Sequence, residues 1–295
     1  MTTRDPTAGV IHDIGYRHYD GERRGRSYIR RSLYVDSLKG AYGLGRSARS
    51  KVMPMILFAG MCLPALAIVA ITAVTGADEL VGGYPSYVLN LQVVVLIFLA
   101  AQAPVAVSRD LRFAVMPLYL SRPLERVDYV LAKYAAMASA LFVLTAAPLT
   151  LMFAGALVAG LPITEQIPDY LKAVAGAGLL SLILGGIGLA IAAVTPRRGL
   201  AVAAIIAVLL VLAGVQGTLQ GLAVVEGYDS IAPYLGLLSP FPLVMGVESA
   251  VLGAPSPLPP PPGVVGALVF CATAVLAVVL PYAALLLRYR SVSVS

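Results

Sequence analysis

The sequence predicts an all-α integral membrane protein with six transmembrane helices. Of its 295 residues, 59% are apolar and 12% are charged, against roughly a quarter charged in ordinary soluble domains. The apolar residues gather in runs long enough to cross a bilayer, for which roughly 20 helical residues suffice. A soluble core of this length needs no such runs, so the bilayer is the expected solvent.

Six apolar runs are the expected transmembrane helices of a domain that covers residues 52–287. They are Val52–Thr75, Tyr87–Val107, Tyr134–Gly160, Ala173–Val194, Leu200–Val225 and Gly263–Leu287. Of the 21 Lys and Arg residues, all except Lys172 lie before the first run, in the 108–133 loop, in the 195–199 turn or in the 288–295 tail. Because positive charge is retained on the cytoplasmic side, both termini are expected in the cytoplasm, and the protein in the plasma membrane.

Residues 1–51 are expected to form a cytoplasmic tail that carries an amphipathic helix. Its apolar side chains recur at helical spacings between residues 28 and 42, with arginines among them. We expect this helix to lie on the inner membrane surface, with arginines near anionic lipid. The side chains expected in the headgroups include Leu33, Tyr34, Leu38 and Tyr42. Alternatively, the arginines only fix the topology; a nucleic-acid partner is not expected.

The segment between the last two runs, residues 226–262, is expected to be extracellular and re-entrant. Its stretch 231–252 is apolar, but three prolines and Glu248 interrupt it. A seventh span there would also place the basic C-terminal tail outside. We therefore expect one or two short helices that dip into the outer leaflet and are covered by protein, followed by an extended proline-rich spacer at 255–262.

The motifs of several enzyme classes are absent from the sequence. It contains no G-x-x-x-x-G-K-[ST] phosphate loop, no H-E-x-x-H and no G-x-S-x-G. Its two cysteines lie in apolar runs and its two histidines in the N-terminal tail. We therefore expect no catalytic activity, no metal site and no cofactor in this chain. The interiors of the six runs hold no acid or base, whereas ion-coupled carriers usually keep one there, so the energy for any transport would come from elsewhere.

Uncharged polar and small residues are concentrated in the second and fifth runs. They are Asn90, Gln92 and Gln102 in the second, and Gln216, Gly217, Gln220 and Gly221 in the fifth. Residues four apart share a helix face, so the two glutamines of the fifth run point the same way, beside a glycine strip that another helix can approach closely. The pattern fits either helix packing or a subunit interface or substrate path.

The cytoplasmic loop 108–133 is expected to end in a short capped helix. Ser121 is its candidate N-cap and Pro123 suits the first turn. Glu125 and Asp128 fall near the positive end of the helix dipole, and Lys133 falls towards the negative end. Such a helix on the inner face of a membrane protein is a rigid handle that another protein could push.

At this loop the chain resembles permeases of the type 2 ATP-binding-cassette (ABC) exporter family. The coupling helix of that family is often written S-R-P-x-x-R-x-x-Y-x-x-x-K. Here that pattern is carried by Ser121, Arg122, Pro123, Arg126, Tyr129 and Lys133. The layout is also similar: about six spans, an amphipathic helix before the first, and broken extracellular helices before the last.

The resemblance implies a dimer of permease subunits, identical or different, each resting on a separate cytoplasmic ATPase. ATP and Mg²⁺ would bind to that ATPase and not to this chain. The side chains implied to face it are Arg122, Pro123, Arg126, Tyr129 and Lys133. An alternative from another class is a non-transport membrane scaffold or regulatory subunit, which would have no ATPase partner.

Overall fold

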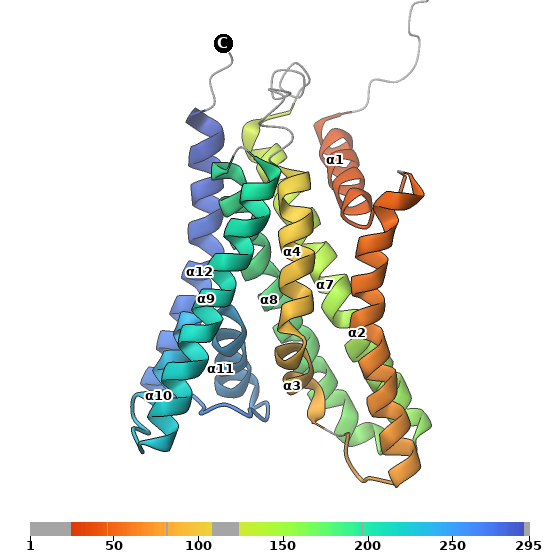
Figure 1. Ribbon diagram of the computed structural model, residues 1–295, viewed down its shortest axis with the longest axis vertical. Helices are drawn as coiled ribbons and strands as arrows, with labels where there is room; N and C mark the ends of the chain where they lie inside the picture. Colours follow the sequence, from red (N-terminus) through yellow and green to blue (C-terminus); the bar gives the residue numbers. More distant parts are fainter. Residues whose placement is uncertain (1–24, 46, 81, 108–123, 196, 292–295) are drawn as a thin grey trace, which may run out of the picture.

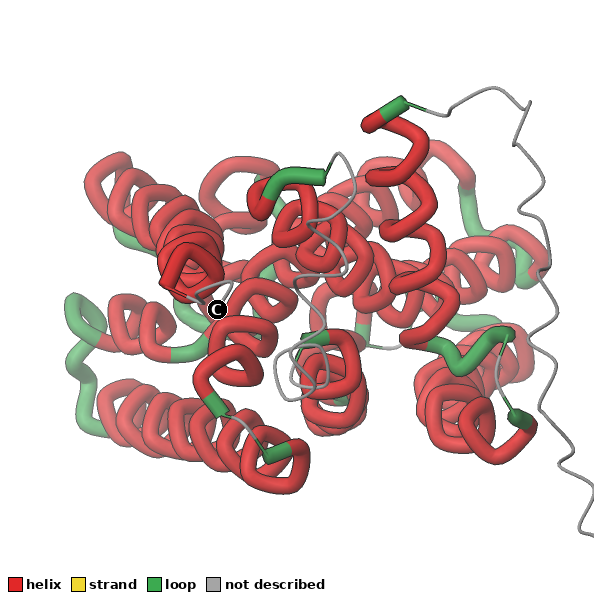
Figure 2. Tube along the Cα trace, turned by 90° about the horizontal axis from the view of Figure 1, so that it is seen from above, coloured by secondary structure: helices red, strands yellow, loops and turns green. Residues whose placement is uncertain are grey.

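The computed structural model describes residues 25–45, 47–80, 82–107, 124–195 and 197–291, and over these ranges it is helical, without strands (Figures 1 and 2). Five helices are long and apolar enough to cross a membrane. They are α2 (Ala48–Thr75), α7 (Arg126–Val158), α8 (Ile163–Val194), α9 (Arg198–Val225) and α12 (Gly263–Ser291). The all-helical membrane fold expected from the sequence is therefore confirmed.

The sixth candidate span is a bent pair of helices. α3 (Gly83–Asn90) and α4 (Gln92–Ala106) meet at Leu91 with an angle of 51°. Only together are they long enough to cross, so the described residues contain up to six candidate spans if this pair counts as one. The sequence predicted a single run from Tyr87, and the break lies between the two amide residues Asn90 and Gln92.

α8 is the central helix of the bundle. Its most apolar stretch is 61% buried, against 17% for those of α2 and α12. Glycines allow neighbouring helices to approach it: a Cβ at Gly188 would overlap the Leu99 side chain of α4, and one at Gly185 would lie 3.3 Å from the Ala138 nitrogen of α7. Membrane helices commonly pack through such small residues.

Two helices begin earlier than the sequence analysis predicted. The expected short helix ending at Lys133 is instead the first two turns of α7, whose N-cap is Glu125 and not Ser121, which lies outside the described residues. Residues 126–147 contain no Gly or Pro, so nothing in them interrupts the helix. α8 likewise begins at Ile163, which brings Asp169 and Lys172 into its first turns.

α1 (Arg26–Ala41) precedes the first span and packs against α7 and α4. The chain then turns into α2 through Gly43, whose φ of 68° disfavours other residues and where a Cβ would overlap the Ser50 carbonyl. In Figure 1, α1, the start of α7 and the end of α12 lie at the same end of the bundle.

The proline-interrupted segment forms α10 (Ala232–Leu235), the 3₁₀ turn η1 (Gly236–Leu238) and α11 (Pro240–Leu252). α11 packs against α8 and α12, and Gly246 lies directly on the Phe270 ring of α12. The segment is thus broken as the prolines indicate, and protein covers α11. Its location in the outer leaflet remains a prediction.

Candidate functional site

A large groove lies where α3 and α4 face α9, and it contains six of the seven amide and glycine residues that the sequence analysis singled out. Its volume is about 940 Å³. The six are Asn90, Gln92, Gln216, Gly217, Gln220 and Gly221, and Pro257, Leu258 and Pro259 of the proline-rich segment complete its wall. We call this the amide groove.

The two glutamines of α9 are held by hydrogen bonds. Gln216 Nε2 donates to Gln220 Oε1 at 2.5 Å, and Gln220 Nε2 donates to the Ala232 carbonyl at 2.9 Å. Both side chains are buried. They therefore hold α10 on α9 in addition to lining the groove.

The glycine strip of α9 is open. No atom lies within 4 Å of the position that a Cβ would take at Gly217 or at Gly221. Among the described residues the strip therefore has no packing partner, and another helix can approach it closely.

Gln102 lies apart from the other amides. It is buried and lines a small cavity of about 40 Å³ between α1, α4 and α7. Lys133 and Asp36 also line this cavity. The structure therefore separates Gln102 from the amide groove, although both belong to the same bent span.

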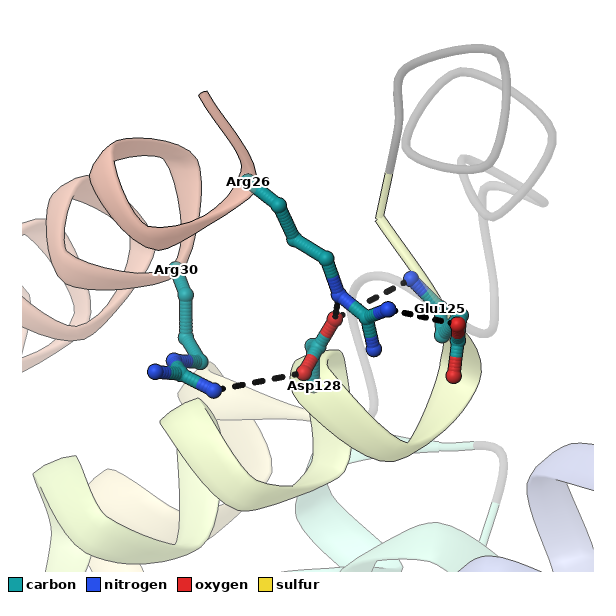
Figure 3. A network of polar contacts seen from close by, with 4 residues as sticks. All are labelled: Arg26, Arg30, Glu125 and Asp128. Atoms are coloured by element: carbon teal, nitrogen blue, oxygen red, sulfur yellow. Dashed lines mark hydrogen bonds and ion pairs between the residues drawn. The ribbon is translucent and has the colours of Figure 1, made fainter. Parts of the chain in front are cut away.

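Charged side chains join α1 to the start of α7 (Figure 3). Arg26 Nε donates to Asp128 Oδ2 at 2.5 Å and Arg26 Nη1 to Glu125 Oε1 at 2.6 Å, while Arg30 Nη1 lies 3.7 Å from Asp128 Oδ1. Asp128 Oδ2 also accepts the Glu125 backbone N–H at 3.4 Å. The hydrogen bond to Asp128, then that to Glu125, raises the pKa of Arg26 above its ordinary value. We call this set the α1–α7 latch.

The apolar side of α1 also packs on α7. Tyr34 donates to Ser139 Oγ at 2.9 Å and Tyr42 donates to the Ala140 carbonyl at 2.7 Å. Leu33 is buried and Leu38 packs against the same core. The sequence analysis expected these side chains in the lipid headgroups; the structure places them against protein, because α7 offers both apolar surface and hydrogen-bond acceptors there.

The residues expected to face an ATPase have different environments. Arg126 donates from Nη1 to the Arg290 carbonyl at 3.2 Å, at an exposed position between α7 and α12. Tyr129 is 0% exposed and its ring lies 5.3 Å from that of Tyr289, so it faces the protein interior instead of a partner. Lys133 lies over the Tyr129 ring at 5.5 Å from its centroid. Arg122 and Pro123 lie outside the described residues.

Glu248 is a buried acid that the sequence analysis grouped with the outer loops. It lies in α11, is 6% exposed, and lines a cavity between α3, α8 and α11. Its carboxyl occupies the space left by Gly176 of α8, where a Cβ would overlap Oε1. The available signal was an acid inside an apolar stretch that was expected to form short helices covered by protein; the sequence analysis treated this acid only as an interruption of the stretch.

A second cavity, of about 570 Å³, opens beside α3 and the start of α8 and is rich in acids. Glu79, Glu165 and Asp169 line it, together with Tyr84, which donates to Gln166 Oε1 at 2.8 Å. We call it the acidic cavity. Across the described part of the chain, no three His, Cys, Asp or Glu residues are grouped so that they could hold a metal ion.

Residues 114–291 match the family model described as "ABC-2 family transporter protein". This range is more than half of the chain and contains all helices from α7 to α12. No curated protein shows a significant match.

Proposed function

Because the chain belongs to the ABC-2 transporter family, and is thus a membrane permease component of an ABC transporter, we propose that it forms the substrate path of an exporter. A separate cytoplasmic ATPase would drive it, binding the ATP and Mg²⁺ that this chain has no motif to hold. The protein would then lie in the plasma membrane, with both termini in the cytoplasm.

The observation that carries the coupling proposal is the continuity of α7. This helix runs without interruption from Arg126, at the end of the bundle that holds α1 and the end of α12, to Val158 (Figure 1). A displacement imposed on its first turn is therefore transmitted along the helix. The α1–α7 latch would carry α1 with it, and the packing of α7 on α8 would carry the central helix.

The amide groove is the proposed substrate path. It offers uncharged amides and apolar walls, which suit the apolar body and the uncharged polar groups of an amphipathic cargo. The open glycine strip in its wall supports a second permease subunit, identical or different, at this face. The path would then lie between the two subunits.

The coupling proposal is tested on the complex purified gently from its own membranes. We expect a stoichiometric partner with a phosphate-loop motif, and we expect Arg126→Glu to lower the ATP hydrolysis of that complex severalfold by reversing charge at the contact. Arg198→Glu makes the same change on α9 and should leave hydrolysis unchanged. Arg126→Ala removes the hydrogen bond to the Arg290 carbonyl without introducing a negative charge, so it separates the effects of these two changes. Normal hydrolysis in the Arg126→Glu complex, or no ATPase partner, contradicts the proposal.

The subunit interface is tested by chemical cross-linking of the same membranes. In the double variant Gly217→Leu and Gly221→Leu, the leucine side chains fill the open strip, so cross-linked dimers should be lost. Gly60→Leu is the matched control, because Gly60 also has no atom within 4 Å of its Cβ position but lies on α2. An unchanged cross-linking pattern in the double variant places the interface elsewhere.

A further inference from the structure

Glu248 is a buried acid without a partner among the described residues. It is 6% exposed, and no hydrogen bond or ion pair joins its carboxyl to another described residue. Burying an ionised carboxylate without a partner is costly, and buried charges in proteins are normally paired. A residue of this kind is better explained by a ligand that supplies the missing partner than by stability.

The cavity next to Glu248 has room for one small polar group. Its volume is about 20 Å³, enough for a single water-sized group. Apart from Glu248 and Tyr84 its walls are apolar, with Leu180, Phe241 and Met245 among them. The Tyr84 hydroxyl already donates to Gln166, so the lining offers no donor to the Glu248 carboxyl.

The nearest base on α8 is already engaged. Lys172 lies one turn before Gly176, and its Nζ donates to Asp169 Oδ1 at 3.0 Å and to the Gly253 carbonyl at 3.4 Å. It therefore ties the start of α8 to the end of α11, and it is not among the residues that line the cavity. No base among the described residues is therefore placed to pair with Glu248.

The Glu248 cavity lies between the two larger hollows of the molecule. It shares Leu89 with the amide groove, and it shares Tyr84 and Pro85 with the acidic cavity. Every charged residue in the linings of these three spaces is an acid: Glu79, Glu165, Asp169 and Glu248. Asp169 is paired with Lys172, but a lining whose charged residues are all acids still raises the local concentration of cations.

We propose that Glu248 binds the protonated amine of an amphipathic cargo, and that the exported substrate class is therefore amines with an apolar body. The proposal rests on the proposed function, because it takes the amide groove as the path. The ammonium group would occupy the small cavity and donate to the Glu248 carboxyl, while the apolar body lies in the adjoining amide groove. After leaving Glu248, the ammonium group would enter the acidic cavity.

The test is equilibrium binding of dansylcadaverine, a fluorescent amphipathic primary amine, to the purified full chain in lipid nanodiscs, followed by fluorescence anisotropy. Its N-acetylated derivative has the same dansyl group but no charge. We expect the amine to bind at least roughly tenfold more tightly than the acetylated probe, the effect of one charge-assisted hydrogen bond. Glu248→Gln should abolish this preference, because it weakens binding of the amine and leaves binding of the acetylated probe unchanged.

A matched control removes an exposed acid instead. Glu226→Gln, at the end of α9, makes the same change of charge and should keep the preference for the amine. Equal binding of both probes, no binding of either, or an intact preference in Glu248→Gln overturns the proposal. The assay uses no ATP, so a chain that prefers the amine but has no ATPase partner would contradict the proposed function and leave the Glu248 site standing.

Discussion

Asp128 and Glu248 are both buried acids on helices, yet their surroundings are opposite. Asp128 is 4% exposed and Glu248 is 6% exposed. Two arginines of α1 and a backbone N–H meet the Asp128 carboxylate. No described group forms a hydrogen bond or ion pair with the carboxyl of Glu248, which lies against the Cα of Gly176.

The difference separates an acid that holds the fold from one that is available to a ligand. A buried carboxylate with its partners in place contributes to a specific contact, and removing one side of such a pair is destabilising. A buried carboxyl with no partner contributes no such contact and is retained at some cost. The latch therefore stabilises the fold, whereas Glu248 is available to the proposed cargo.

The strongest test compares the stabilities of two isosteric variants. Asp128→Asn removes the charge that two arginines share, and we expect it to lower the free energy of unfolding by about 2 kcal/mol. Glu248→Gln removes no partner and should leave stability unchanged or slightly higher. Thermal unfolding in detergent, followed by circular dichroism, measures both.

An exposed acid gives the baseline for that experiment. Asp36→Asn on α1 should lower the midpoint temperature of unfolding by less than Asp128→Asn does, because Asp36 is exposed. If Glu248→Gln were as destabilising as Asp128→Asn, Glu248 would have a structural partner and the contrast between the two acids would fail.

The sequence sufficed for the fold class and for the membrane runs, because long apolar stretches have few alternatives to spanning a bilayer. The amides of the second and fifth runs were also singled out from the sequence, and the amide groove contains all of these except Gln102. Helical periodicity places residues on a face, but it does not say which neighbour that face meets. Gln102 shows this limit, since it faces α1 and not α9.

The partner of α1 could not be predicted for the same reason. An amphipathic pattern fits a lipid surface and a protein surface equally well, and Tyr34 and Tyr42 find their acceptors about 100 residues away in α7. Tyr129 matched a motif position but is buried against Tyr289, at the far end of the chain. In both cases the missing information is a contact between distant segments.

A smaller effect is expected from filling the space under Glu248. Gly176→Ala places a Cβ where the carboxyl lies, and we expect a loss of about 1 kcal/mol from overpacking. Gly178→Ala is the control two residues away, because its Cβ would lie 3.8 Å from the Phe142 ring, an ordinary contact. That change should be neutral or stabilising, since Ala is the better helix former.

Gly176→Ala also tests the contact between Glu248 and Gly176. Adding Glu248→Ala to Gly176→Ala should recover most of the lost stability, which a double-mutant cycle in thermal unfolding reports as a coupling of about 1 kcal/mol. Strictly additive effects would mean that Glu248 does not rest on Gly176, and the geometry that directs its carboxyl into the cavity would be incorrect.

The smallest effect distinguishes the two arginines of the latch. Arg30 lies 3.7 Å from Asp128 with half of its side chain exposed, whereas Arg26 makes two short bonds to Asp128 and Glu125. Arg30→Ala should therefore cost no more than about 0.5 kcal/mol, as for surface ion pairs, and Arg26→Ala should cost more. Unfolding in 1 M salt, where the Debye length is about 3 Å, should erase the Arg30 effect first. If Arg30→Ala lowered the free energy of unfolding more than Arg26→Ala did, the longer contact of Arg30 with Asp128 would be the one that stabilises the latch.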